Sequence, residues 1–173
     1  SISHAGYLAI GLAAGNHDAV AGVIFYLAAY TFMNLGAFGI VSLLEGKDET
    51  NLSINSYAGL GNRKPLLSAM LTIIMFSLAG LPPFAGFFGK YYIFIAAVKS
   101  NLTWLAILGV LSSAISVYFY LRIVVLMYFK SSENEFEIES SNNSMLAIIF
   151  SILVVILLGV FPGTFLDLIT RFI

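Results

Sequence analysis

The sequence contains no cysteine and only two histidines, His4 and His17. The missing cysteines exclude a disulfide framework, a thiolate metal site and a redox-active thiol. Two histidines are too few to hold a haem or a metal cluster by themselves. With a net charge of −1, the chain has no excess of basic residues that would predict nucleic-acid binding. No phosphate-binding glycine loop, no catalytic serine–histidine–aspartate set and no pair of intramembrane carboxylates is visible, so the sequence has no evident machinery for bond-making chemistry.

Charged residues are scarce too. They make up 10% of the 173 residues, against about 25% in soluble domains. Hydrophobic residues make up 60%, and the mean hydropathy is +0.96. This composition indicates an all-α, polytopic transmembrane helix bundle. The predicted membrane segments are 1–15, which is partial, then 19–45, 66–98, which is broken, 102–129 and 145–161.

Residues 1–15 are apolar but shorter than the roughly 20 residues that a spanning helix needs, so we expect them to be the second half of a helix. The chain has no initiator methionine and no signal-peptide pattern, and we expect it to be cut from a longer protein. Loops 46–64 and 130–144 carry more lysine and arginine than the other side, so we predict that both are cytoplasmic. We expect the tail 165–173 to lie at the membrane interface.

The apolar stretch 66–98 contains a cluster of helix breakers. Pro82 and Pro83 have no backbone N–H group, and Gly80 and Gly86 flank them. A continuous helix cannot run through such a cluster. We therefore predict two half-helices, with free backbone carbonyls and amides at the break that can meet water or an ion.

Lys90 is the only charged residue between Lys64 and Lys99. At about 1.5 Å per residue it lies roughly 13 Å from Lys99, deep in a hydrocarbon core about 30 Å thick. A lysine at that depth faces the protein interior or a wet cavity, and burial disfavours its charged form. The functional interpretation is a proton carrier beside the helix break. The alternative is a structural lysine that snorkels outward or pairs permanently with a carboxylate.

Two further residues are candidates for a proton relay. His4 could pass protons to or past Lys90, or it could be a neutral imidazole that is hydrogen-bonded to a neighbouring helix. Tyr30 belongs to a polar stripe with Tyr26, Thr31 and Asn34. Such a stripe could hold a water chain or supply interhelical hydrogen bonds.

Four motifs resemble a known family. They are Ser-Ile-Ser-His-Ala-Gly-Tyr at 1–7, the stretch 26–38, the stretch 77–92 around Leu-Pro-Pro and Gly-Lys-Tyr-Tyr, and Tyr-Phe-Tyr-Leu-Arg at 118–122. In this order and spacing they resemble the subunit N family of bacterial NADH-quinone oxidoreductase, which is respiratory complex I. The resemblance implies an antiporter-like fold, of which this chain would be the C-terminal third.

The resemblance also implies roles. Lys90 falls at the lysine of the family's broken twelfth helix, which is proposed to lie on the proton path, and Pro82 and Pro83 fall at the break. His4 and Tyr30 fall on helices that line the central polar axis. NADH, FMN, the Fe-S clusters and quinone would be bound by other subunits, so no cofactor is expected in this chain. The implied partners are antiporter-like and small membrane-arm subunits, the lipid bilayer and protons, and no nucleic acid.

Two alternatives stay open on these residues. The D-type component of multisubunit Na⁺/H⁺ antiporters shares a very similar Leu-Pro-Pro and Gly-Phe-Phe-Gly-Lys stretch, although His4 and the stretch 30–38 favour subunit N. The other alternative is a purely structural membrane-arm subunit, in which Lys90 is a fixed ion pair.

Overall fold

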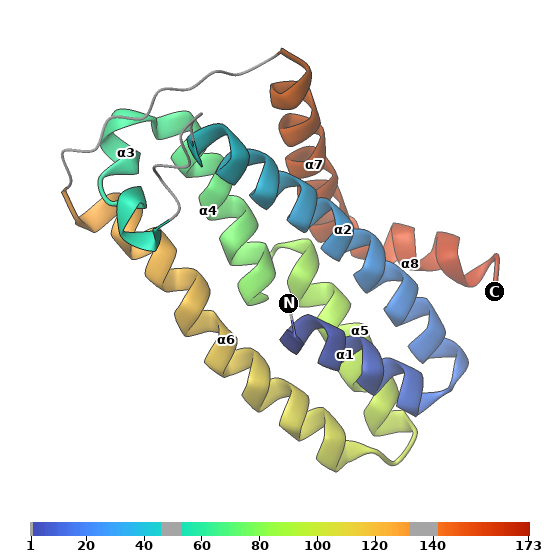
Figure 1. Ribbon diagram of the computed structural model, residues 1–173. Coiled ribbons are helices and arrows are strands. Elements are labelled where there is room, and N and C mark those ends of the chain that lie inside the picture. Colours follow the sequence, from blue (N-terminus) through green and yellow to red (C-terminus); the bar gives the residue numbers. More distant parts are fainter. Residues whose placement is uncertain (1, 46–52, 132–141) are drawn as a thin grey trace.

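The computed structural model describes residues 2–45, 53–131 and 142–173, and every regular element in these ranges is helical (Figure 1). In chain order the elements are α1 (Ile2–Ala14), α2 (His17–Glu45), the 3-10 turn η1 (Ile54–Tyr57), α3 (Leu60–Arg63), α4 (Pro65–Ala79), α5 (Ala85–Lys99), α6 (Thr103–Phe129), α7 (Asn142–Val160) and α8 (Pro162–Thr170). The all-α class that the composition predicts is confirmed.

The helix predicted to be broken is indeed two helices. α4 ends at Ala79 and α5 begins at Ala85. Each has 15 residues, which corresponds to about 22 Å and is too short to cross a hydrocarbon core of about 30 Å. By contrast α2, α6 and residues 143–160 of α7 are long and apolar enough to cross a membrane.

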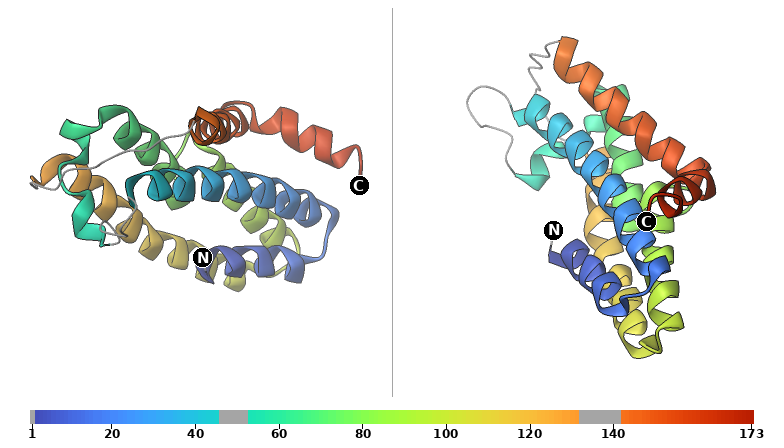
Figure 2. Two further views of the ribbon diagram at one scale, coloured as in Figure 1. Left: turned by 45° about the horizontal axis from the view of Figure 1, so that its top comes forward. Right: turned by 90° about the vertical axis from the view of Figure 1, so that its right-hand side faces the viewer.

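α2 is the central helix of the bundle. Its most extensive contacts are with α5 and α7, and it also packs against α1, α4 and α8. Figure 2 shows α7 and α8 on one side of α2 and α1 on the other. α2 and α5 approach closely at Gly89, where a Cβ atom would lie 2.4 Å from the ring of Tyr26 and 3.3 Å from its Cα. A small residue at this position lets the two backbones approach.

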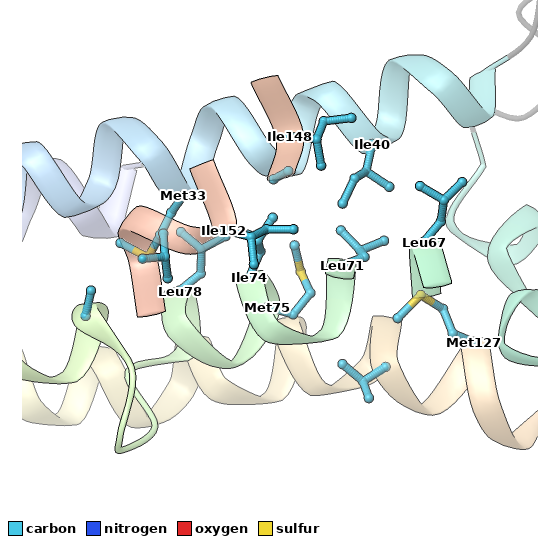
Figure 3. Packing of buried hydrophobic residues seen from close by; sticks show 14 of the residues in the cluster. Met33, Ile40, Leu67, Leu71, Ile74, Met75, Leu78, Met127, Ile148 and Ile152 are labelled. Carbon is cyan, nitrogen blue, oxygen red and sulfur yellow. The ribbon is translucent and has the colours of Figure 1, made fainter. Parts of the chain in front are cut away.

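The main apolar core lies between α2, α4, α6 and α7 (Figure 3). Side chains from these four helices interdigitate around the face that α2 turns toward α4. They include Met33, Ile40, Leu71, Ile74, Met127, Ile148 and Ile152. This core fixes α4 against its neighbours, so the end of α4 is held in a defined place.

A polar cluster ties the α1–α2 turn to the end of α5. The Asn16 side chain caps α2 by accepting from the Ala19 N–H at 2.7 Å, as Asn commonly does at a helix start. It also donates to Ala96 O at 3.0 Å and to Ser100 Oγ at 2.8 Å. At the same end Lys99 pairs with Asp18 at 2.5 Å, and both side chains are more than half exposed.

Parts of the predicted loops lie outside the described residues, namely 46–52 and 132–141. Residues 53–64 form η1 and α3, which dock on α6 through the Gly59 N–H and Leu126 O at 3.3 Å. The tail that we expected at the interface is largely helical, as α8. The side of the membrane on which the loops lie stays a prediction.

Candidate functional site

The break follows from a glycine-terminated helix. Gly80 has φ = +86°, a left-handed conformation that glycine adopts without penalty. Its N–H donates to Phe76 O at 3.1 Å and to Ser77 O at 3.0 Å, and the Leu81 N–H also donates to Phe76 O. This is the usual way in which a helix ends at a C-terminal glycine. Pro82 and Pro83 then lie exposed in the connection, as the breaker cluster predicts.

Ser77 joins the two half-helices. Its buried hydroxyl accepts from the Gly86 N–H at 3.2 Å, so the last turn of α4 caps the first turn of α5. A Cβ on Gly86 would lie 1.8 Å from Ser77 O, which only glycine avoids. Gly86 lies in the first turn of α5 and so flanks the break, as Gly80 does at the end of α4. α7 packs closely against the connection between α4 and α5 at Gly159, where a Cβ would lie 2.3 Å from Pro83 O.

Lys90 reaches back from α5 to the end of α4. The residue is 4% exposed. Its Nζ donates to Leu78 O at 3.1 Å, Ala79 O at 3.0 Å and Ser113 Oγ at 3.0 Å. An ammonium group has three N–H donors, and each of these contacts uses one. The two carbonyls belong to the C-terminal end of α4, where the helix dipole is negative.

Tyr7 covers the ammonium from α1. The Lys90 Nζ atom lies 5.0 Å from the centroid of the Tyr7 ring, within the range of a cation–π contact. The Tyr7 ring is buried, and its hydroxyl lies 3.5 Å from Ser116 Oγ. Within the described residues, the partners of Lys90 Nζ are two carbonyls, one hydroxyl and one aromatic ring, and none of them is a carboxylate.

His4 lies one helical turn from Tyr7 and is also buried. Its Nδ1 is 2.6 Å from the Tyr26 hydroxyl, and its Nε2 is 2.7 Å from the Tyr120 hydroxyl. A neutral imidazole has one donor and one acceptor nitrogen. In either tautomer one tyrosine therefore accepts from His4 and the other donates to it. Such a group can take a proton on one side and release it on the other.

Tyr30 contacts His4 through its ring. The two rings stack with their centroids 4.7 Å apart. Next to Tyr30 on α2, Asn34 donates to Tyr30 O at 2.9 Å and Thr31 donates to Leu27 O at 2.8 Å. The side chains of Asn34 and Thr31 are thus bonded within their own helix. Together with Tyr30 they line a cavity of about 770 Å³ between α2 and α7.

The structure thus brings His4, Tyr30 and Lys90 to one cluster, with Tyr7 between His4 and Lys90: the His4 and Tyr7 ring centroids are 5.7 Å apart. The sequence patterns did not single out Tyr7, Tyr120 or Ser113 as site residues. Tyr7 could have been found, because it follows His4 by three residues and so shares its helix face. Within the described ranges, no group of three or more His, Cys, Asp or Glu side chains could hold a metal ion.

A bundle of apolar helices, with one discontinuous helix and a buried lysine at the break, defines a polytopic membrane protein of the kind that includes transporters. A family model described as NADH:quinone oxidoreductase/Mrp antiporter, TM matches residues 1–116. The chain therefore belongs to this family. The predictions of a multi-pass membrane protein and of an antiporter-like fold are confirmed.

Curated relatives carry the name that the four motifs suggest. NADH-quinone oxidoreductase subunit N of Trichlorobacter lovleyi is 53% identical over 137 residues, which is 79% of this chain and 28% of the relative. Subunit N 1 of Solibacter usitatus is 46% identical over 173 residues, 99% of this chain and 36% of the relative. The resemblance to subunit N is confirmed. The chain spans about a third of the length of these relatives.

Solved structures of respiratory membrane complexes contain chains with the same fold. A chain of respiratory complex I from Thermus thermophilus with bound NADH is 28% identical and superposes with a TM-score of 0.82, over 96% of this chain and 36% of that one. A chain of the membrane-bound sulfane sulfur reductase, an archaeal respiratory membrane complex, is 25% identical with a TM-score of 0.69, over 89% of this chain and 31% of that one.

Proposed function

We propose that this chain is the C-terminal third of a proton-translocating membrane subunit of NADH-quinone oxidoreductase. The subunit couples NADH oxidation and quinone reduction to proton transport across the membrane. Lys90 is the proton carrier, and His4 and Tyr30 belong to its relay. The observation that supports this most is a buried lysine at a helix break, surrounded by neutral acceptors.

The neutral surroundings are what a proton carrier needs. A lysine that is permanently paired with a carboxylate keeps its charge, because removing the proton would leave the carboxylate unpaired. At Lys90 the described partners are two helix-end carbonyls, one hydroxyl and one aromatic ring. These groups stabilise the ammonium only partly. A change of charge elsewhere in the membrane arm would then suffice to shift the proton occupancy of Lys90.

The relay uses groups that both donate and accept. His4 links the Tyr26 and Tyr120 hydroxyls, which come from α2 and α6. Tyr7 holds this cluster beside Lys90 by ring contacts with His4 and with the ammonium, and these contacts position the two groups without carrying a proton. Tyr30 stacks on His4 and borders the cavity between α2 and α7. We propose that water in that cavity extends the relay away from His4.

Redox chemistry belongs to other subunits in this proposal. NADH, FMN, the Fe-S clusters and quinone are bound elsewhere in the complex, and this chain contacts antiporter-like and small membrane-arm subunits, lipid and protons. Loops 46–64 and 130–144 face the cytoplasm, so protons enter from that side. The relatives named subunit N favour this assignment over the D-type component of a multisubunit Na⁺/H⁺ antiporter, although the family description includes both.

The test is Lys90→Met in the intact parent complex, reconstituted into proteoliposomes. Proton uptake is measured per NADH oxidised and compared with wild type and with Lys99→Met. Lys99 is a matched control, because its ammonium is largely exposed and lies at the far end of α5. We expect Lys90→Met to lower pumping and coupled turnover while the complex still assembles, and Lys99→Met to behave as wild type. Unchanged pumping in Lys90→Met would make Lys90 a structural residue.

A further inference from the structure

Ser113 on α6 differs in kind from the other two acceptors around Lys90. Leu78 and Ala79 offer backbone carbonyls, which accept hydrogen bonds but have no proton to donate. Ser113 offers a hydroxyl at 3.0 Å from Nζ. A hydroxyl both accepts and donates, and its hydrogen rotates freely about the C–O bond.

This difference matters once Lys90 changes its charge. The ammonium form has three N–H donors, and three acceptors meet them. The neutral amine has two N–H donors and one lone pair, so it needs a donor as well. Neither carbonyl can supply one. Leaving a buried polar group without a partner is costly, and among the described contacts of Nζ the Ser113 hydroxyl is the one that can donate to the amine.

We propose that Ser113 is a positioning residue that allows Lys90 to occupy both charge states at the helix break. Its hydroxyl accepts from the ammonium and, after rotating, donates to the neutral amine, so Nζ stays at the end of α4 in both states. This proposal depends on the proposed function, because it assumes that Lys90 changes its charge during the cycle.

The neighbouring serines on α6 do not take this role. The Ser116 hydroxyl donates to Ser112 O at 2.9 Å and so is bonded within its own helix. Ser113 instead is half-buried and lines, together with Lys90 and Gly80, a cavity of about 600 Å³ between α5 and α6. That space gives the hydroxyl room to reorient. Ser112, one residue away, takes no part in the described hydrogen bonds of Nζ and does not line this cavity, so it provides a matched control.

The titratable groups near Lys90 are a histidine and tyrosines. α4 and α7 contribute none, since neither helix contains a titratable side chain. Those on α1, α2, α5 and α6 are His4, Tyr7, Tyr26, Tyr30, Tyr91 and Tyr120. None of them contacts Ser113 in a hydrogen bond of the described region. A change in pH dependence caused by altering Ser113 is therefore assigned to Lys90.

The experiment compares Ser113→Ala, Ser113→Thr and Ser112→Ala in the reconstituted parent complex, with Lys90→Met alongside. Proton pumping per NADH and coupled turnover are measured across pH. We expect Ser113→Ala to lower coupled turnover about tenfold, the scale of one hydrogen bond to a charged group, and to change the pH profile. Ser113→Thr, which keeps the hydroxyl, restores both, and Ser112→Ala matches wild type.

The outcomes separate the two proposals. If Lys90→Met is inactive but Ser113→Ala pumps with a normal pH profile, the role of Ser113 is refuted and the proton carrier stands. If Ser113→Ala fails and Ser113→Thr does not restore it, or if Ser113→Ala prevents assembly, Ser113 is a packing residue and the inference is wrong. If Lys90→Met pumps normally, the proposed function itself is wrong.

Discussion

Replacing His4 with phenylalanine removes both hydrogen bonds of the imidazole and leaves the Tyr26 hydroxyl buried without its partner. The phenylalanine ring preserves the stacking on Tyr30, so the change is mainly the loss of polar contacts. Tyr26 is 0% exposed, and a buried hydroxyl without a partner costs about 1–3 kcal/mol. Measured hydrogen bonds between membrane helices are weaker, about 0.6 kcal/mol on average and about 1.7 at most. We therefore expect a destabilisation of about 1–2 kcal/mol.

Tyr26→Phe leaves the opposite partner unsatisfied and has a similar effect. The double variant His4→Phe/Tyr26→Phe removes both polar groups, and such paired removal is nearly neutral for the hydrogen bond itself. Its destabilisation is therefore smaller than the sum of the two single effects by about 1 kcal/mol. The double variant still loses the hydrogen bond between His4 and Tyr120. This loss costs little, because Tyr120 is only half-buried and its hydroxyl can bond to water.

The assay is the thermal midpoint at which the parent complex disassembles in native membranes, read on native gels. We predict that the double variant lowers the midpoint by less than the two single variants combined. Additive shifts would contradict the prediction, because they would mean that His4 and Tyr26 stabilise the bundle independently of their 2.6 Å contact.

Two further predictions concern the break and the aromatic cover. Gly86→Ala prevents assembly of the subunit, because the new Cβ would lie 1.8 Å from Ser77 O. The control Gly163→Ala assembles normally, because a Cβ on Gly163 would have no neighbour within 4 Å. A native gel of the membrane fraction compares the two variants. Tyr7→Leu lowers coupled turnover about fivefold, since a cation–π contact with Lys90 contributes about 1 kcal/mol, while Tyr7→Phe keeps the ring face and retains that turnover. Equal turnover in the two Tyr7 variants would contradict the cation–π contact.

The helix break could be predicted because its cause is local. Pro82 and Pro83 cannot continue a helix, and Gly80 takes up the positive φ that ends α4. The reason for a glycine at position 86 could not be predicted, because it depends on the close approach of Ser77 across the break. Two of the carbonyls freed by the break accept from Lys90 of the same chain, a pairing that the sequence alone does not reveal.

The cluster around Lys90 could be predicted only in part. Helix periodicity places Tyr26 and Tyr30 on one face of α2, but it does not decide which of them bonds His4. The partner Tyr120 is 116 positions from His4, and Ser113 is 23 positions from Lys90. These contacts depend on how α1, α5 and α6 pack, and neither Tyr120 nor Ser113 has a local signal that distinguishes it from its neighbours on α6.

A proton carrier at Lys90 must gain and lose a positive charge, and Lys90→Arg distinguishes such a carrier from a fixed charge. Arginine keeps a positive group that carbonyls and a hydroxyl can accept from, but it cannot lose its proton in a protein. The measurement is the number of protons pumped per NADH by the reconstituted parent complex. We predict that Lys90→Arg assembles and pumps as poorly as Lys90→Met. Pumping at the wild-type ratio in Lys90→Arg would contradict the claim, because a fixed positive charge at the end of α4 would then suffice.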